Sequence, residues 1–144
     1  MGIVGIGSDV LEIKRMASSG KKYGDRLYRR LFTPEEIAYC ESKGRPQEHY
    51  AARFAAKEAA LKALGVGWAR GVTWVDVEIV RQEKGPPTLR FSGVAKELAE
   101  ALGVRRAHLS LSHTRELAMA NVILEGDPPK GDSPAETSAE AERA

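Results

Sequence analysis

The alternation of apolar and polar positions predicts short strands mixed irregularly with helices. Residues 3–10 (IVGIGSDV) are apolar and β-branched, which is typical of a buried strand that ends near Asp9. Further strands are predicted at 75–79, 88–91, 107–113 and 117–124. The last two are separated only by a short polar connection and predict an antiparallel hairpin. This arrangement favours an α+β fold of mixed helices and a largely antiparallel sheet rather than a regular βαβ series.

Periodicity and end signals predict the helices between these strands. They are expected at about 11–16, 26–31, 34–43, 48–64 and 93–102. The first should break at residues 18–20, where two serines precede a glycine. Thr33, Pro34 and Glu36 form a capping box with proline at the first helical position. Gly65 is expected to end the long fourth helix, and Ser92 to cap the last one.

Charge is distributed unevenly along the chain, although the net charge is only +2. Residues 14–30 hold seven Lys and Arg against one acidic residue. Residues 126–144 are acidic and rich in Pro, Ser and Ala, so we expect a mobile tail after a domain at 1–125. No apolar run reaches the length of a membrane span, and no secretory signal is recognisable. A single cysteine, Cys40, allows no intrachain disulfide and favours the reducing cytoplasm. Without an apolar span, we expect no interaction with a membrane.

Candidate chemistry centres on the helix RFAAKEAALKALG at 53–65. Glu58 falls at the edge of its apolar stripe, where a carboxylate needs a partner. It could pair with Lys62 four residues further on. Alternatively, Glu58 and Asp9 could hold Mg²⁺, which proteins often bind through one or two carboxylates while water and substrate phosphate complete the shell. Lys57, Lys62 and Arg53 lie near enough in sequence to neutralise phosphate oxygens.

Other suggestive residues have plainer interpretations. Gly5 and Gly7 match only two glycines of the dinucleotide-binding fingerprint, because Val10 stands at the third position. His113 ends a predicted strand, where a histidine is more often structural than catalytic. Trp68 and Trp74 flank a glycine-containing loop and are expected to anchor packing.

Three separated stretches resemble one family. The segments GIGSDVLEIKR (5–15), RFAAKEAALKALG (53–65) and LSLSHTRELAMANVILE (109–125) are similar to the holo-acyl-carrier-protein synthases, a small bacterial group of 4′-phosphopantetheinyl transferases. The resemblance covers about residues 1–125. It implies the 4′-phosphopantetheinyl transferase fold. It also implies transfer of phosphopantetheine from coenzyme A to a serine of apo acyl carrier protein, releasing adenosine 3′,5′-bisphosphate, for fatty acid biosynthesis.

The resemblance also implies roles for particular residues. Asp9 and Glu58 would hold Mg²⁺, and Glu58 and Lys62 would be the catalytic pair, with Lys62 on the pyrophosphate. The implied coenzyme A contacts are Arg45, Arg53, Lys62, Gly65, Pro87 and His113. Docking of the acidic carrier protein is expected at Arg15, with Arg26 and Arg30 continuing the surface. Similar proteins are homotrimers whose active sites lie between neighbouring subunits.

Two other classes remain open at this stage. The basic segment at 14–30 supplies enough cations for non-specific nucleic-acid binding, although no nucleic-acid fold signature accompanies it. A non-catalytic carrier-binding module would keep Arg15 without needing Asp9, Glu58 and Lys62. Because all three of those residues are present, we expect a transferase that does not bind nucleic acid.

Overall fold

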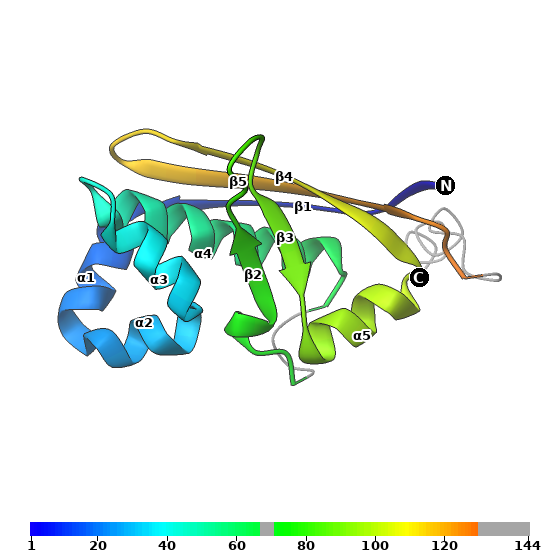
Figure 1. The fold of residues 1–144 in the computed structure, drawn as a ribbon, viewed down its shortest axis with the longest axis horizontal. Helices are drawn as coiled ribbons and strands as arrows, with labels where there is room; N and C mark the ends of the chain where they lie inside the picture. The colour runs from blue at the N-terminus through cyan, green and yellow to red at the C-terminus, as the bar shows by residue number, and fades with distance from the viewer. Residues whose placement is uncertain (67–70, 130–144) are drawn as a thin grey trace, which may run out of the picture.

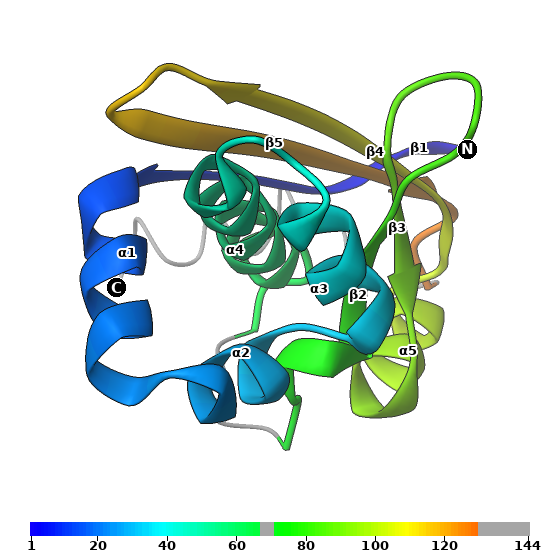
Figure 2. The same ribbon diagram turned by 60° about the vertical axis from the view of Figure 1, so that its left-hand side comes forward.

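A long helix lies along one face of a three-stranded antiparallel sheet in the structure, a computed structural model that describes residues 1–66 and 71–129 (Figure 1). The sheet contains β1 (Gly2–Glu12), β5 (Leu117–Gly126) and β4 (Val104–His113), in that order. The helix is α4 (Pro46–Ala63). In both ribbon views α4 covers one side of the sheet, and no helix or strand of the described residues covers the other side (Figure 2).

Small residues let β1 and α4 approach each other closely. A Cβ added to Gly7 would lie 1.9 Å from the Ala59 carbonyl oxygen, and one added to Gly5 would lie 2.0 Å from that of Ala63. Ala59 itself is fully buried. The glycines that resemble part of a nucleotide-binding fingerprint therefore serve packing of a strand on a helix.

The remaining elements flank the two halves of α4. Its N-terminal half is surrounded by α1 (Ile13–Tyr23), α2 (Asp25–Leu31) and α3 (Pro34–Glu41). A second, two-stranded sheet of β2 (Val77–Val80) and β3 (Thr88–Phe91) is preceded by a 3-10 turn, η2 (Trp74–Asp76), and followed by α5 (Gly93–Ala101). The predicted α+β fold, the C-terminal hairpin and the Thr33–Glu36 capping box are confirmed.

Several predicted boundaries are wrong near the N-terminus. Leu11 belongs to β1 rather than to a helix, because it pairs with Ala118 of β5. The expected break at 18–20 is absent, and α1 continues to Tyr23. Gly20 instead makes room for α2, since an added Cβ would lie 2.0 Å from the Tyr28 hydroxyl oxygen. Tertiary packing thus explains the glycine that looked like a helix breaker.

Three further boundaries differ from the sequence prediction. The long helix begins at Pro46, two residues before the predicted start, because proline suits the first turn of a helix. Val75 lies in η2, so the strand begins only at Val77. Ser92 precedes α5 as expected, but its side chain makes no capping hydrogen bond.

The C-terminal segment was predicted to separate from the domain after residue 125. Within the described part, β5 extends to Gly126, and Asp127 forms ion pairs with the N-terminal amine of Met1 at 3.2 Å and with Arg105 at 3.1 Å. The rest of the predicted tail, 130–144, and the loop residue Trp68 lie outside the described residues. No helix among the described residues is long and apolar enough to cross a membrane.

Candidate active site

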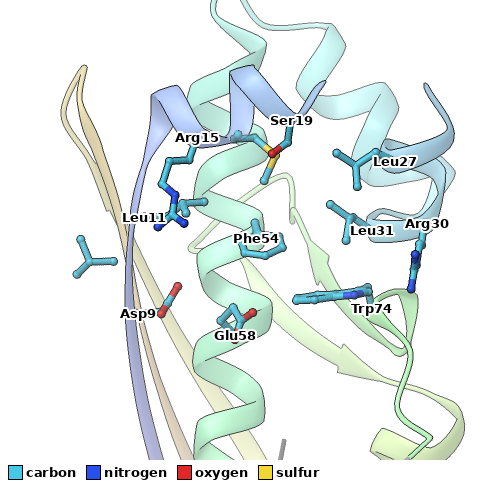
Figure 3. Close-up of a pocket in the computed structure, with 12 residues that line it drawn as sticks. Asp9, Leu11, Arg15, Ser19, Leu27, Arg30, Leu31, Phe54, Glu58 and Trp74 are labelled. Atoms are coloured by element: carbon cyan, nitrogen blue, oxygen red, sulfur yellow. The ribbon is translucent and has the colours of Figure 1, made fainter. Parts of the chain in front are cut away.

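A cavity of about 630 Å³ opens between β1, α1, α2 and α4 (Figure 3). Asp9 and Glu58 line its floor from β1 and α4, and in the close-up they lie on facing elements. Arg15 and Arg30 contribute positive charge from α1 and α2. Phe54 of α4 and Trp74 of η2 form an apolar wall beside Glu58. Two carboxylates, two guanidinium groups and an aromatic wall therefore share one hollow.

Lys62 joins this group through β1. Its ammonium donates hydrogen bonds to Asp9 Oδ1 at 3.0 Å and to the Ser8 carbonyl oxygen at 3.0 Å. The Lys62 side chain is 55% exposed, whereas that of Asp9 is 19% exposed. An exposed lysine loses little by exchanging these partners for a phosphate, because surface ion pairs contribute at most about 1 kcal/mol.

The strand register explains why Asp9 faces the helix. Asp9 pairs with the fully buried Ala120 of β5 and shares the inner face of the sheet with Gly7. Side chains alternate between the two faces of a strand, so Asp9 points inward. The predicted strand end near Asp9 is wrong, because β1 continues to Glu12. On the other element, Glu58 is half-buried, as its place at the edge of the apolar stripe predicted.

The donor set of the cavity fits Mg²⁺. Two carboxylates reach the cavity, and no group of three or more His, Cys, Asp or Glu that could hold a metal occurs among the described residues. One or two carboxylates with oxygen ligands from water and phosphate form the usual protein site for this ion, whereas zinc prefers four nitrogen or sulfur ligands. Asp9 and Glu58 are the residues that would hold it.

Lys57 cannot serve the phosphate, contrary to the expectation from its position in the sequence. Its side chain is fully buried and does not line the cavity, and it forms an ion pair with Glu36 at 2.8 Å. Burial lowers the pKa of Lys57 below the usual lysine value, and the Glu36 carboxylate acts against this shift. A lysine so enclosed has a structural role.

Arg53 also lies apart from Asp9 and Glu58. It lines a second cavity of about 420 Å³ between α3, α4 and β2, together with Tyr39 and Arg81. Its guanidinium carbon lies 4.0 Å from the centre of the Tyr39 ring. Arg53 is 3% exposed, and its buried Nε has no hydrogen-bond partner in the structure.

Arg45 and His113 come together at the start of α4, far apart in sequence. Glu48 contacts both, with 3.4 Å to Arg45 Nη1 and 3.6 Å to His113 Nδ1. The His113 ring also packs edge-on against His49, with 5.8 Å between ring centres, and His49 in turn packs against Tyr39. Arg45, Arg53 and His113 therefore belong to a second cluster of Arg and His side chains, separate from the one around Asp9.

The remaining predicted residues occupy different places. Gly65 follows α4 with a positive φ of 72°, a conformation that favours glycine. Pro87 is half-buried in the connection before β3. Arg30 lines the Asp9 cavity, whereas Arg26 does not. Sequence reasoning treated Trp74 only as a packing anchor, and its place beside the cavity had no local signal.

Comparison with known proteins gives the class to which this fold and site belong. The family model described as the 4′-phosphopantetheinyl transferase superfamily matches residues 5–120. Because that match covers well over half of the sequence, the chain belongs to the 4′-phosphopantetheinyl transferase superfamily.

The individual relatives have a narrower name than the superfamily. A holo-[acyl-carrier-protein] synthase from Koribacter versatilis is 54% identical over 123 residues, covering 85% of this chain and 98% of the relative. The crystal structure of the corresponding Neisseria meningitidis protein superposes with a TM-score of 0.78 at 34% identity, covering 85% of this chain and 98% of that one. The structure of a holo-(acyl-carrier-protein) synthase from Bacillus anthracis, in complex with CoA (3′,5′-ADP), has a TM-score of 0.70 at 36% identity. The match covers 88% of this chain and 100% of that one.

Proposed function

We propose that this chain is a magnesium-dependent holo-[acyl-carrier-protein] synthase that transfers 4′-phosphopantetheine from coenzyme A to a serine of apo acyl carrier protein. The observation that supports it most strongly is that Asp9 and Glu58 line one cavity from two elements, while Lys62 contacts Asp9 at 3.0 Å. The names of relatives that the chain matches over nearly their whole length agree with this activity. A binding module would have no need for this arrangement.

The chemistry is a displacement at phosphorus. The serine oxygen forms a bond to the phosphorus of the phosphopantetheine group, and the bond from that phosphorus to the bridging pyrophosphate oxygen breaks. The serine proton passes to a cavity carboxylate or to a water molecule, and adenosine 3′,5′-bisphosphate leaves with the bridging oxygen. Mg²⁺ held by Asp9 and Glu58 would supply charge neutralisation on the pyrophosphate.

In this proposal Lys62 acts on the leaving group. Its ammonium is held at Asp9 by a contact that a pyrophosphate oxygen can replace. A cation at that position stabilises the negative charge that develops on the departing phosphate and can donate a proton to it. Glu58 lines the same cavity from α4, the element that faces Asp9 on β1.

Carrier docking is assigned to the basic helices beside the cavity. Arg15 and Arg30 line the cavity, and Arg26 lies on the same short helix as Arg30. Positive charge next to a catalytic hollow steers an acidic protein partner and raises its association rate. The target serine would enter between these helices and Trp74.

A homotrimer with active sites between subunits would explain why the residues assigned to coenzyme A form two separate groups in one chain. Arg45, Arg53 and His113 lie away from Asp9 and Glu58 in one chain, yet coenzyme A is proposed to contact both groups. A neighbouring subunit would supply the second cluster, with Gly65 and Pro87 at the border of the site. The uncovered face of the sheet offers the contact between subunits, since Ile6 is 68% exposed and Met119 41% exposed on it.

We place the protein in the cytoplasm, together with its two substrates.

The test is incubation with coenzyme A, Mg²⁺ and apo acyl carrier protein, followed by intact-mass measurement of the carrier. We expect the mass to increase by one phosphopantetheine group. Asp9→Asn and Glu58→Gln should lower the rate by at least about 100-fold, as loss of a central charge in an active site does, while circular dichroism stays unchanged. Glu97→Gln, on the exposed side of α5, is the matched control. An unmodified carrier would refute the proposed activity.

A further inference from the structure

Trp74 is held beside the cavity by a short turn rather than by a regular element. It opens η2, a turn of three residues between the cavity and β2. Its ring stacks on Phe54 with 4.8 Å between ring centres and an interplanar angle of 25°. Figure 3 shows the indole extending from this turn toward Phe54 and Glu58. A three-residue turn has few backbone hydrogen bonds of its own to fix such a side chain.

Thr73 and Asp76 cap this turn locally, and Lys57 adds a long-range anchor from α4. Its ammonium donates to the Trp74 carbonyl oxygen at 3.0 Å, to the Val77 carbonyl oxygen at 2.7 Å and to Glu36 Oε1 at 2.8 Å. These three bonds use all three ammonium protons. Glu36 Oε2 in turn accepts the Ile79 amide at 3.2 Å. The Lys57 ammonium of α4 therefore binds the first residue of η2, the first residue of β2 and a carboxylate of α3.

The same helical turn carries the residue that faces the chemistry. Phe54, Lys57 and Glu58 are three and four residues apart, so they lie within about one turn of α4. Phe54 holds the Trp74 ring, Lys57 holds its carbonyl group, and Glu58 lines the cavity. The position of Trp74 relative to Glu58 is thus set by adjacent residues of one rigid helix.

A buried lysine is a costly way to fill space. Two fully buried charges seldom stabilise a fold more than apolar residues of similar volume would. An apolar side chain at position 57 could pack equally well, but it could not bind the carbonyl oxygens of Trp74 and Val77. The charge is therefore explained by the placement of η2 rather than by core stability.

We propose that Lys57 is a positioning residue for carrier recognition, because it holds Trp74 as the apolar wall on which the serine-bearing segment of the carrier protein rests. This inference rests on the proposed transferase activity. Trp74 shares its cavity with Arg15 and Arg30, which are assigned to the carrier. Of the residues assigned to coenzyme A, Arg45, Arg53 and His113 lie elsewhere and only the pyrophosphate comes near this cavity, so loss of the wall should affect chiefly the carrier protein.

The experiment uses the neutral double variant Lys57→Met with Glu36→Gln, which avoids leaving one charge buried alone. We expect the KM for the carrier protein to rise about tenfold, which corresponds to about 1.4 kcal/mol, while the KM for coenzyme A stays within twofold. Trp74→Ala should raise the carrier KM by a similar factor. Adding the double variant to Trp74→Ala should then cause little further change, because both act through the same wall. A fully additive effect, or a rise in the KM for coenzyme A, would overturn the proposal.

Two measurements keep the outcome clear. In a Trp68→Phe background, Trp74 is the only tryptophan, and acrylamide should quench its fluorescence more strongly once Lys57 is replaced. Binding of fluorescently labelled apo carrier protein can be measured by anisotropy without any transfer, so it separates failure of this inference from failure of the proposed reaction. If the double variant does not fold, Trp74→Ala decides alone: unchanged carrier affinity in that variant would contradict the wall.

Discussion

Basic residues in this chain have different roles because of their burial. Lys57 is fully enclosed and uses its three protons on fixed partners, whereas Lys62, five residues later, is 55% exposed and reaches Asp9 across the surface. A buried ammonium that loses a partner is destabilised strongly, but an exposed one exchanges partners freely. Burial therefore makes Lys57 structural and leaves Lys62 available to a substrate.

Protonation of His49 should make the stability of the fold depend on pH. Its own burial, followed by the charge of Arg53 and then that of His113, lowers its pKa from the usual 6.5. Lys43 acts in the same direction and Glu48 against it. Below about pH 6.5 the unfolded chain therefore binds a proton at His49 more readily than the folded chain does, and stability falls with falling pH.

We expect the urea midpoint to decrease between about pH 7.5 and about pH 5.5, and His49→Asn to remove part of that decrease. His108→Asn is the control, since His108 lies on the sheet near Glu125, away from this cationic cluster. An identical pH dependence in wild type and His49→Asn would show that His49 does not contribute.

At the scale of elements, the active-site geometry depends on how closely β1 approaches α4. Asp9 and Glu58 sit on those two elements, and Gly7 lies two residues before Asp9 on the same face of the strand. The glycine permits backbone contact with α4 at Ala59. A larger residue would separate the strand from the helix and the two carboxylates with them.

Gly7→Ala should destabilise the fold by about 1–3 kcal/mol, because its Cβ meets backbone atoms that cannot move aside. Transfer activity should fall as well, since Asp9 moves with the strand. Urea unfolding and the carrier mass assay measure the two effects. Gly2→Ala, where an added Cβ meets nothing within 4 Å, should change stability by less than about 0.5 kcal/mol. Equal stability of the two variants would contradict this account.

For the whole molecule, the main unexplained surface is the outer face of the three-stranded sheet. Ile6 pairs with Ile123 across β1 and β5, and Val10 pairs with Met119. Between these pairs the Ser8 hydroxyl donates to Asn121 Oδ1 at 2.7 Å. Apolar side chains arranged around one polar pair are expected to lie at the contact between copies of this chain in the proposed trimer.

Ile6→Asp should therefore convert the trimer to monomers, because it places an unpaired charge in that contact. Sedimentation velocity measures the change directly. Tyr23→Asp is the control, since Tyr23 is also more than half exposed but lies at the end of α1. Transfer activity should be lost together with the trimer if neighbouring subunits share the active site. A monomeric wild-type protein would contradict the assembly.

The sequence by itself determined the features that depend on neighbouring residues. Thr33 and Glu36 mark a helix start because capping involves atoms only three residues apart. The hairpin of β4 and β5 follows from alternation and a short connection. The edge position of Glu58 follows from helical periodicity. The residues alone left open whether Glu58 pairs with Lys62 or shares Mg²⁺ with Asp9, and the motif resemblance favoured Asp9.

Only the tertiary structure decided which charges meet and which are enclosed. Lys57 and Lys62 lie only five residues apart on α4, yet one packs against Glu36 and the other reaches Asp9, 53 residues earlier in the chain. The same holds for Gly20, which looks like a helix breaker but admits the Tyr28 hydroxyl. Burial and long-range contacts arise from the packing of distant elements, which no local pattern records.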